Sequence, residues 1–305
     1  MKKTNSIRVF APGKLMLLGE HAVVYGYPCI SFAIDRGVTV ELSEGLRADK
    51  VTSSVSDDRF IRVAKDVFFQ KNAVRRVPMH ITIKSEISGY GLGSSSAVAV
   101  ATITALLQFY AISFSKQKVF DLSYEAVKKI QPKASGYDVA TTIYGGVILF
   151  DGKTKQVKKI NIKDFPFLVG FSTVKADTST LVEQVSEQKE RESQRIDAIF
   201  SSIGHLVKEG IQAFNNRDWK RLGGIMDENQ RMLSMLGVST NRLDEMIFVA
   251  KHHGALGAKL SGAGGGDCII VLCWKNSKQI MYETLKKAGI PMVPLNFSSK
   301  GVRQL

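Results

Sequence analysis

The sequence is poor in the residues that form crosslinks and metal sites. It contains three cysteines, two tryptophans and five histidines among 305 residues. Cys29, Cys268 and Cys273 form no CxxC pair, and they are not spaced with the histidines as zinc ligands are. We therefore expect neither a disulfide framework nor a structural zinc ion.

Long apolar stretches are missing as well. The longest, residues 97–112, is interrupted by Thr102, Thr104 and Gln108 and is shorter than the ~20 residues that span a bilayer. The first residues lead directly into strand-like sequence instead of an apolar secretion signal. We predict a cytoplasmic protein with no membrane partner, in which residues 97–112 form a buried helix.

Acidic side chains are outnumbered by basic ones, 28 to 42, and the net charge is +14. Such a charge favours anionic ligands, either nucleic acid or a phosphorylated metabolite. Basic pairs such as Arg75/Arg76 and Lys158/Lys159 are scattered, without interleaved aromatic residues or a recognisable nucleic-acid module. We expect a small-molecule substrate and no nucleic-acid partner, with a basic nucleic-acid-binding protein as the alternative.

The apolar pattern divides the chain into two parts. Val38, Val40 and Leu42 alternate with polar residues, as in a half-buried strand, and the same period recurs at Ile81 and Ile83. Residues 181–214 instead carry apolar side chains at helical spacing, and two more helical faces follow before a strand-loop-strand unit at 258–273. We predict an N-terminal domain at residues 1–165 and a C-terminal domain at 166–305.

A glycine-serine segment at residues 89–96 separates a predicted strand from the predicted helix at 97–112. Its three glycines give the backbone freedom to close around phosphate oxygens, and the amides at the helix start can donate to them. No Gly-Lys-Ser/Thr follows, so it is not a Walker loop, and it lacks the third glycine of the dinucleotide fingerprint. The segment predicts a site for a polyphosphate.

Two further segments complete a pattern. Residues 11–26 read APGKLMLLGEHAVVYG, and residues 259–268 read KLSGAGGGDC. Together with the glycine-serine segment they resemble the signature set of the GHMP kinase family, over the chain from Arg8 to Leu272. The resemblance implies an α+β fold with two domains, an N-terminal one with a left-handed βαβ unit and a ferredoxin-like C-terminal one. It also implies ATP and Mg²⁺ as cofactors, bound with the acceptor between the domains.

A fourth segment, residues 134–146, resembles the catalytic stretch of the family. By this resemblance Asp138 accepts the proton of the acceptor hydroxyl or orients it, and Lys14 stabilises the negative charge on the aspartate and on the transferring group. Residues 264–266 line the opposite wall. The nucleotide-binding residues implied are Ser85, Gly89, Gly91, Leu92, Gly93, Ser94 and Ser95.

The metal ligands depart from the family pattern. The resemblance makes Ser95 a Mg²⁺ ligand, but the family's usual glutamate, eleven residues before the catalytic aspartate, is Val127 here. Glu125 could serve if its helix is shifted, or it is a solvated surface residue. We carry Glu125 forward as the candidate carboxylate.

The first motif points to the acceptor. GEHAVVYG, with Glu20 and His21, is the form found in mevalonate kinases, where this histidine contacts substrate. Residues 174–180 resemble the substrate-side loop of that group and nominate Thr178, and Tyr144 closes the catalytic stretch. We therefore expect ATP-dependent phosphorylation of the 5-hydroxyl of mevalonate, a step of isoprenoid precursor biosynthesis.

Other features favour phosphomevalonate as the acceptor. No asparagine follows Asp138, Gln131 stands where a His-Gly pair usually begins, and Asp267 interrupts the last glycine run. A nucleotide-binding relative without catalysis is a further alternative, and a homodimer is compatible with the sequence. The basic residues that could hold a second phosphate are Lys128, Lys129 and Lys133.

Overall fold

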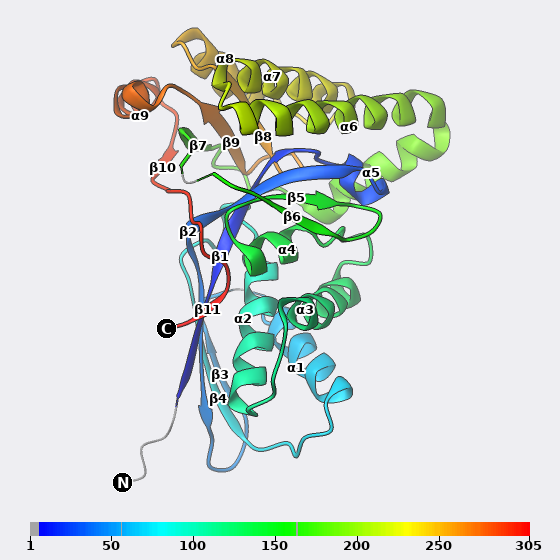
Figure 1. Ribbon diagram of the computed structural model, residues 1–305, viewed down its shortest axis with the longest axis vertical. Helices are drawn as coiled ribbons and strands as arrows, with labels where there is room; N and C mark the ends of the chain where they lie inside the picture. The colour runs from blue at the N-terminus through cyan, green and yellow to red at the C-terminus, as the bar shows by residue number, and fades with distance from the viewer. Residues whose placement is uncertain (1–5, 56, 163) are drawn as a thin grey trace.

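The computed structural model describes residues 6–55, 57–162 and 164–305. Two helix-covered sheets lie one above the other along the long axis (Figure 1). The first part of the chain contains β1 (Ile7–Leu18), η1 (Ala22–Tyr25), β2 (Pro28–Glu44), β3 (Lys50–Ser53), α1 (Arg59–Lys71), β4 (Met79–Ser85), α2 (Ser94–Phe109), α3 (Lys116–Ile130), α4 (Tyr137–Tyr144), β5 (Val147–Asp151) and β6 (Val157–Ile160).

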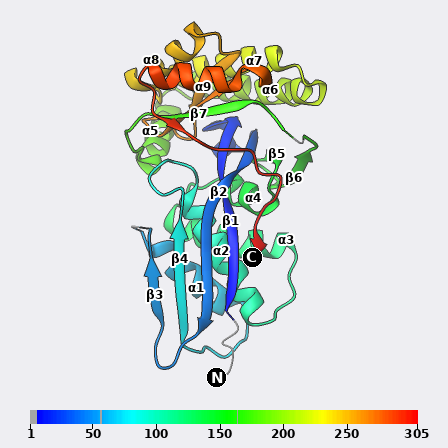
Figure 2. The ribbon, with the colours of Figure 1, turned by 90° about the vertical axis from the view of Figure 1, so that its left-hand side faces the viewer.

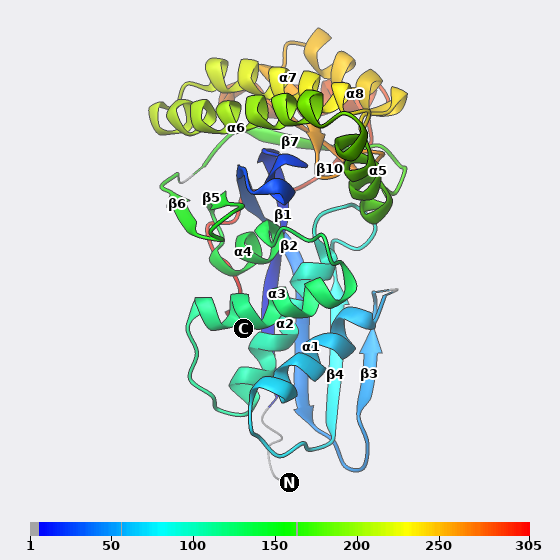
Figure 3. The same cartoon turned by 90° about the vertical axis from the view of Figure 1, so that its right-hand side faces the viewer.

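The first sheet is built around the long strand β2, which pairs with β1 along most of its length. Its C-terminal half pairs with β4 and its N-terminal half with β5, so Val40 lies between Val9 and Ile83. Val38, Val40 and Leu42 are fully buried, which confirms the predicted strand pattern. Helices α1, α2 and α3 cover one face of this sheet, as Figures 2 and 3 show from opposite sides.

The βαβ unit of this sheet has the unusual hand. Strands β3 and β4 are parallel neighbours, and α1 connects them. In Figure 3, α1 lies in front of the sheet and the chain passes from β3 leftward to β4; Figure 2 shows the same step from behind. The crossover is therefore left-handed, whereas such units are generally right-handed. This confirms the left-handed βαβ unit that the family resemblance implies.

The second sheet contains the remaining strands in the order β10-β7-β9-β8, all antiparallel. Numbered along the chain, the order is fourth, first, third, second, with helices after the first and third strands, which is the ferredoxin-like arrangement. Its elements are β7 (Phe167–Phe171), α5 (Thr178–Arg191), α6 (Ser193–Asn216), α7 (Trp219–Met235), α8 (Asn241–His252), β8 (Gly257–Ser261), β9 (Cys268–Leu272), η2 (Lys275–Ser277), α9 (Lys278–Lys287) and β10 (Met292–Val293).

The end of the chain returns to the first sheet. Strand β11 (Arg303–Gln304) pairs with β1, and the Asn296 side chain donates to Asp35 at 2.9 Å. The chain changes sheets between β6 and β7, the segment in which the sequence places the boundary between residues 165 and 166. The last residues therefore belong structurally to the first layer, although their sequence was assigned to the second domain.

Helix α2 is the buried helix expected at residues 97–112, and it ends at Phe109. Its side chains are buried on every face because it packs between the first sheet and the helices α1 and α3. No helix in the described part of the chain is long and apolar enough to cross a membrane. The three cysteines are buried and unpaired, and no group of three or more metal-binding side chains occurs among the described residues.

Candidate active site

One cavity of about 780 Å³ lies where the loops of the two sheets meet. Stretches that are far apart in the sequence line it, among them the middle of β1, the segment around η1, the start of α1, the glycine-serine loop with the start of α2, the segment that leads into α4, and the loops that follow β7 and β8. Lys14, Ser95, Asp138 and Thr178 are all on its wall. Folding therefore brings the predicted phosphate loop, cation and carboxylate to a single site.

The glycine-serine loop presents the start of α2 to this cavity. Gly89, Gly91 and Gly93 have φ values of +87°, +70° and +81°, a region that favours glycine. The first backbone bond of the helix runs from the Ala97 amide to the Gly93 carbonyl at 3.1 Å. The amides of residues 94–96 are thus helix-start donors beside the cavity, where an anion binds most favourably.

Strand β1 fixes the position of this loop through the backbone and side chain of Lys14. The Lys14 amide donates to the Leu92 carbonyl at 2.9 Å, and the Lys14 Nζ donates to the Gly91 carbonyl at 3.4 Å. A Cβ on Gly93 would lie 2.8 Å from Lys14 Cγ, so the lysine chain passes directly under a glycine. This close approach places the ammonium beside the glycine-serine loop.

The Lys14 side chain is buried at the centre of the site. Burial lowers the pKa of Lys14, but the Tyr137 phenol and the carboxylates of Asp138 and Asp267 outweigh it, and the net shift is upward. Burial also raises the pKa of Tyr137 to about 12, so the phenol is neutral, and its ring centre is 5.3 Å from Nζ. At neutral pH the site therefore contains a fixed ammonium.

Asp138 is held by two hydrogen bonds in the first turn of α4. Its Oδ2 accepts from Ser96 Oγ at 2.5 Å, and its Oδ1 accepts from the Val139 amide at 2.9 Å. Ser96 comes from the buried side of the α2 start and is 1% exposed. The Ser96 contact fixes the carboxylate against the start of α2, a link that the sequence did not reveal.

The two polar residues of the GEH motif have different positions. Glu20 forms a fully buried ion pair with Lys259 of β8, and burial raises the pKa of Glu20 while it lowers that of Lys259. Glu20 therefore joins the first and third motifs behind the cavity wall. His21 is on the wall, where its Nε2 lies 2.8 Å from the Ala263 carbonyl, and burial lowers its pKa so that the imidazole is neutral.

The third motif contributes to the wall with the residues that flank its glycine run. Gly262, Ala263 and Asp267 line the cavity, whereas residues 264–266 pack against Val238, Leu181 and Val174. Asp267 has a φ of +56°, and its Oδ1 accepts from the Ala176 amide at 3.1 Å.

Besides Glu20, three expected site residues lie outside the cavity lining that the structure describes. Ser85 stands behind the wall, with its Oγ 3.4 Å from Ser94 Oγ. Tyr144, at the far end of α4, has its ring 5.3 Å from the Lys116 ammonium. Glu125 pairs with Lys71 and Lys129 on the outer side of α3, because Ala126 and Val127 face the core. The structure does not bring Glu125 or Tyr144 to the site.

Comparison with known proteins agrees with this geometry. The model of the GHMP kinases N terminal domain matches residues 58–146, that of the GHMP kinases C terminal matches 211–290, and a galactokinase galactose-binding signature matches 2–44. The mevalonate kinase of Thermococcus sibiricus is 31% identical to this chain and covers 96% of both sequences.

Solved structures extend the likeness to three dimensions. The Methanococcus jannaschii mevalonate kinase is 27% identical, with a TM-score of 0.81 over 97% of this chain and 99% of that one. A Streptococcus pneumoniae phosphomevalonate kinase, 20% identical with a TM-score of 0.82 over 96% and 99%, shares the fold. With both family models matched and a relative aligned along nearly its whole length, this chain belongs to the GHMP kinase family of ATP-dependent phosphotransferases.

Proposed function

We propose that this chain transfers the γ-phosphoryl group of Mg²⁺-bound ATP to the 5-hydroxyl of mevalonate. The observation that carries the proposal is the meeting of Lys14, the α2 start and Asp138 at one cavity. The relatives named mevalonate kinase support the choice of acceptor.

The phosphates of ATP fit the start of α2. The loop of Gly89, Gly91, Leu92 and Gly93 would wrap the phosphate chain, and the helix-start amides would donate to it. The Ser94 and Ser95 hydroxyls are on the cavity wall, and Ser85 supports Ser94 from behind. Ser95 would hold the Mg²⁺ that accompanies the nucleotide and neutralises part of its charge.

Asp138 and Lys14 would carry out the transfer. A new bond forms between the acceptor oxygen and the γ-phosphorus while the bond from that phosphorus to the β–γ bridging oxygen breaks. The hydroxyl proton passes to the Asp138 carboxylate, which Ser96 keeps in one orientation. The buried Lys14 ammonium stabilises the charge that develops on the transferring group.

The acceptor would lie between His21 and the start of α5, where Thr178 faces the cavity. A neutral imidazole and a hydroxyl suit an alcohol substrate. Two of the three lysines suggested for a second phosphate are paired with carboxylates: Lys129 with Glu125 at 3.7 Å, outside the cavity, and Lys133 with Glu183 at 2.8 Å on the cavity wall. This pairing favours mevalonate over phosphomevalonate.

Product analysis tests the proposal. The purified protein is incubated with ATP·Mg²⁺ and either mevalonate, 5-phosphomevalonate, galactose or homoserine, and products are identified by mass. We expect ADP and 5-phosphomevalonate with mevalonate, at a far higher rate than with the other acceptors. Faster turnover of 5-phosphomevalonate would reassign the acceptor, and no ADP with any acceptor would contradict the proposed activity.

A further inference from the structure

The position that usually supplies a metal-binding glutamate in this family holds an apolar residue here. Val127 is fully buried in α3, and Glu125 forms ion pairs on the outer side of the same helix. Mg²⁺ at a nucleotide is commonly held by one or two carboxylates together with phosphates and waters. If this chain uses a carboxylate, it must come from another element of the cavity wall.

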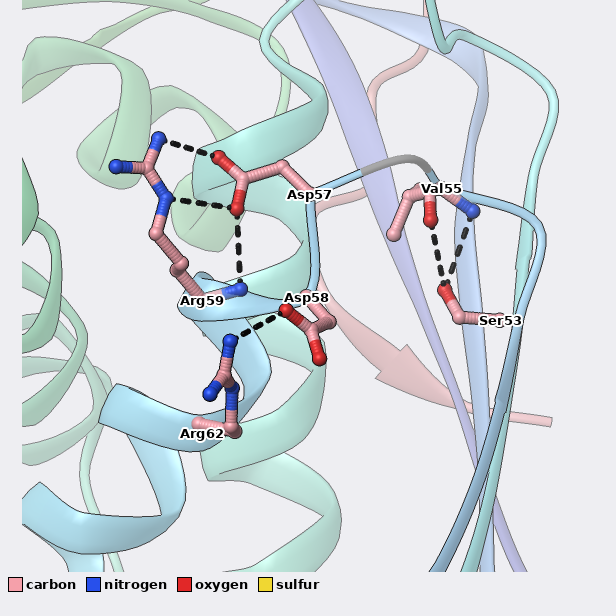
Figure 4. A network of polar contacts seen from close by, with 6 residues as sticks. All are labelled: Ser53, Val55, Asp57, Asp58, Arg59 and Arg62. Carbon is pink, nitrogen blue, oxygen red and sulfur yellow. Dashed lines mark hydrogen bonds and ion pairs between the residues drawn. The ribbon is translucent and has the colours of Figure 1, made fainter.

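Most carboxylates on the wall already have their oxygens engaged. Asp57 accepts from Arg59 Nε and Nη2 at 2.9 and 2.8 Å, as Figure 4 shows. Both Asp138 oxygens accept hydrogen bonds, and both Asp177 oxygens cap the start of α5. Glu183 pairs with Lys133. The carboxylate-bearing residues among the described lining residues are Asp57, Asp138, Asp177, Glu183 and Asp267.

Asp267 differs from Asp57, Asp138 and Asp177, whose carboxylate oxygens all accept hydrogen bonds, and from Glu183, whose side chain is exposed and paired with Lys133. Its Oδ1 accepts the Ala176 amide, but its Oδ2 accepts no hydrogen bond from the residues that the structure describes. That oxygen is pressed against the phosphate loop, because a Cβ built on Gly91 would lie only 2.2 Å from it. Burial raises the pKa of Asp267, although Lys14 and Lys175 oppose the shift.

A free carboxylate oxygen beside a polyphosphate loop repels the ligand unless a cation lies between them. The Lys14 ammonium is shared with Asp138 and is itself needed by the phosphates. A divalent cation relieves the repulsion because it binds phosphate and carboxylate oxygens together.

We propose that Asp267, and no residue of α3, is the carboxylate that binds the Mg²⁺ of ATP in this chain, directly or through one water of the metal. The motif loop after β8 then carries a metal ligand as well as structural glycines. The inference rests on the proposed nucleotide site, but it does not depend on which alcohol is the acceptor.

The isosteric variant Asp267→Asn separates the charge from the structural contact. Its amide oxygen can still accept the Ala176 amide, so the loop is kept while the negative charge is lost. Affinity for the non-hydrolysable analogue AMPPNP is measured without acceptor, once with Mg²⁺ and once with EDTA. We expect the Mg²⁺ form to bind on the order of tenfold more weakly, and the metal-free form to bind equally or more tightly.

A second readout follows the metal itself. Retention of Mn²⁺ in the protein–AMPPNP complex, measured by electron paramagnetic resonance, should fall by a similar factor in Asp267→Asn. The matched control is Glu125→Gln, which removes one carboxylate outside the cavity. It should leave both the Mg²⁺ dependence of AMPPNP binding and the retention of Mn²⁺ unchanged.

The outcomes are distinct. An unchanged Mg²⁺ dependence in Asp267→Asn overturns the inference, and so does equal weakening of both nucleotide forms, which indicates a structural role. If the asparagine variant does not fold, Asp267→Gly replaces it, because the φ of +56° suits glycine. Failure of the unaltered protein to bind AMPPNP under either condition would instead remove the nucleotide site on which the inference rests.

Discussion

The two glycine-rich loops of this chain look alike in sequence but serve different purposes. In the loop of residues 89–93 the glycines expose the start of α2 to the cavity, and Gly89 has open space around it. In the loop of residues 262–267, a Cβ on Gly264 would lie 2.1 Å from the Val238 carbonyl, and one on Gly265 would lie 2.7 Å from Leu181. The first loop therefore lies at the cavity, where Gly91 and Gly93 are approached by the side chains of Asp267 and Lys14, whereas Gly264 and Gly265 of the second loop pack against other parts of the chain.

The largest effect should come from the carboxylate that the first loop faces. Asp138→Asn keeps the size of the side chain but removes the proton acceptor, and we expect kcat to fall by about 10²–10⁴. Nucleotide affinity should change little, because Asp138 is bonded to Ser96 and not to the loop glycines. Steady-state kinetics with mevalonate and a separate AMPPNP titration measure the two quantities.

An equal loss of kcat and of AMPPNP affinity in Asp138→Asn would show that this aspartate organises the loop. Asp138 would then be needed for the conformation of the loop at residues 89–93 as well as for catalysis. Circular dichroism of the variant serves as the control for folding.

Matched substitutions in the two loops should separate loss of stability from loss of nucleotide binding. In Gly264→Ala the added methyl group would clash with the Val238 carbonyl oxygen, and the φ of +82° is unfavourable for alanine. We therefore expect this substitution to lower the free energy of unfolding by about 2–4 kcal/mol. Gly93→Ala, with a φ of +81° and Lys14 Cγ at 2.8 Å, should instead displace the ammonium and weaken AMPPNP binding. Denaturant unfolding and nucleotide titration are run on both proteins.

The predicted pattern is a loss of stability with normal nucleotide affinity in folded Gly264→Ala. If folded Gly264→Ala binds AMPPNP much more weakly while its stability is unchanged, the second loop is a ligand loop too.

Gly89→Ala should have a smaller effect than either of these. Apart from its neighbours in the chain, no described residue lies within 4 Å of the added methyl group, so the left-handed backbone, at a φ of +87°, is what resists the change. We expect about 1–2 kcal/mol of lost stability and a modest rise in the KM for ATP. A loss as large as that of Gly264→Ala would mean that the loop is packed more tightly than its open surroundings indicate.

The smallest effect concerns pH. Burial lowers the pKa of His21, so the unfolded chain takes up a proton at a higher pH than the folded chain. Stability from this group is complete above the ordinary histidine pKa of about 6.5 and declines as the pH falls below it. His21→Gln should reduce the difference in unfolding free energy between pH 7.5 and pH 5.5, and an unchanged difference would contradict the assignment.

The local sequence was sufficient to predict the conformation of the loop at residues 89–93. It was insufficient to predict what the glycines of the loop at residues 262–267 contact. Glycines followed by serines at the start of an apolar helix have a direct backbone meaning, and Val38, Val40 and Leu42 carry the period of a strand. Whether glycines 264–266 touch ligand or protein depends on Val238 and Leu181, which no local pattern connects to them.

Long-range contacts account for the other differences. Glu20 became a buried partner of Lys259 because the two motifs meet only after folding. The Ser96–Asp138 contact joins two helix starts that are 42 residues apart, and the break between α5 and α6 at Glu192 has neither glycine nor proline to signal it. Strand β11 contains two residues, too few for a periodic pattern.

The amide resonances of the two loops report which of them the nucleotide contacts. Nitrogen-15 spectra of the protein are recorded with and without AMPPNP·Mg²⁺. Large shifts at the amides of residues 94–96, with small ones at 264–266, are the predicted result, because only the first set lies at the cavity. Shifts concentrated at 264–266, with residues 94–96 unmoved, would contradict it.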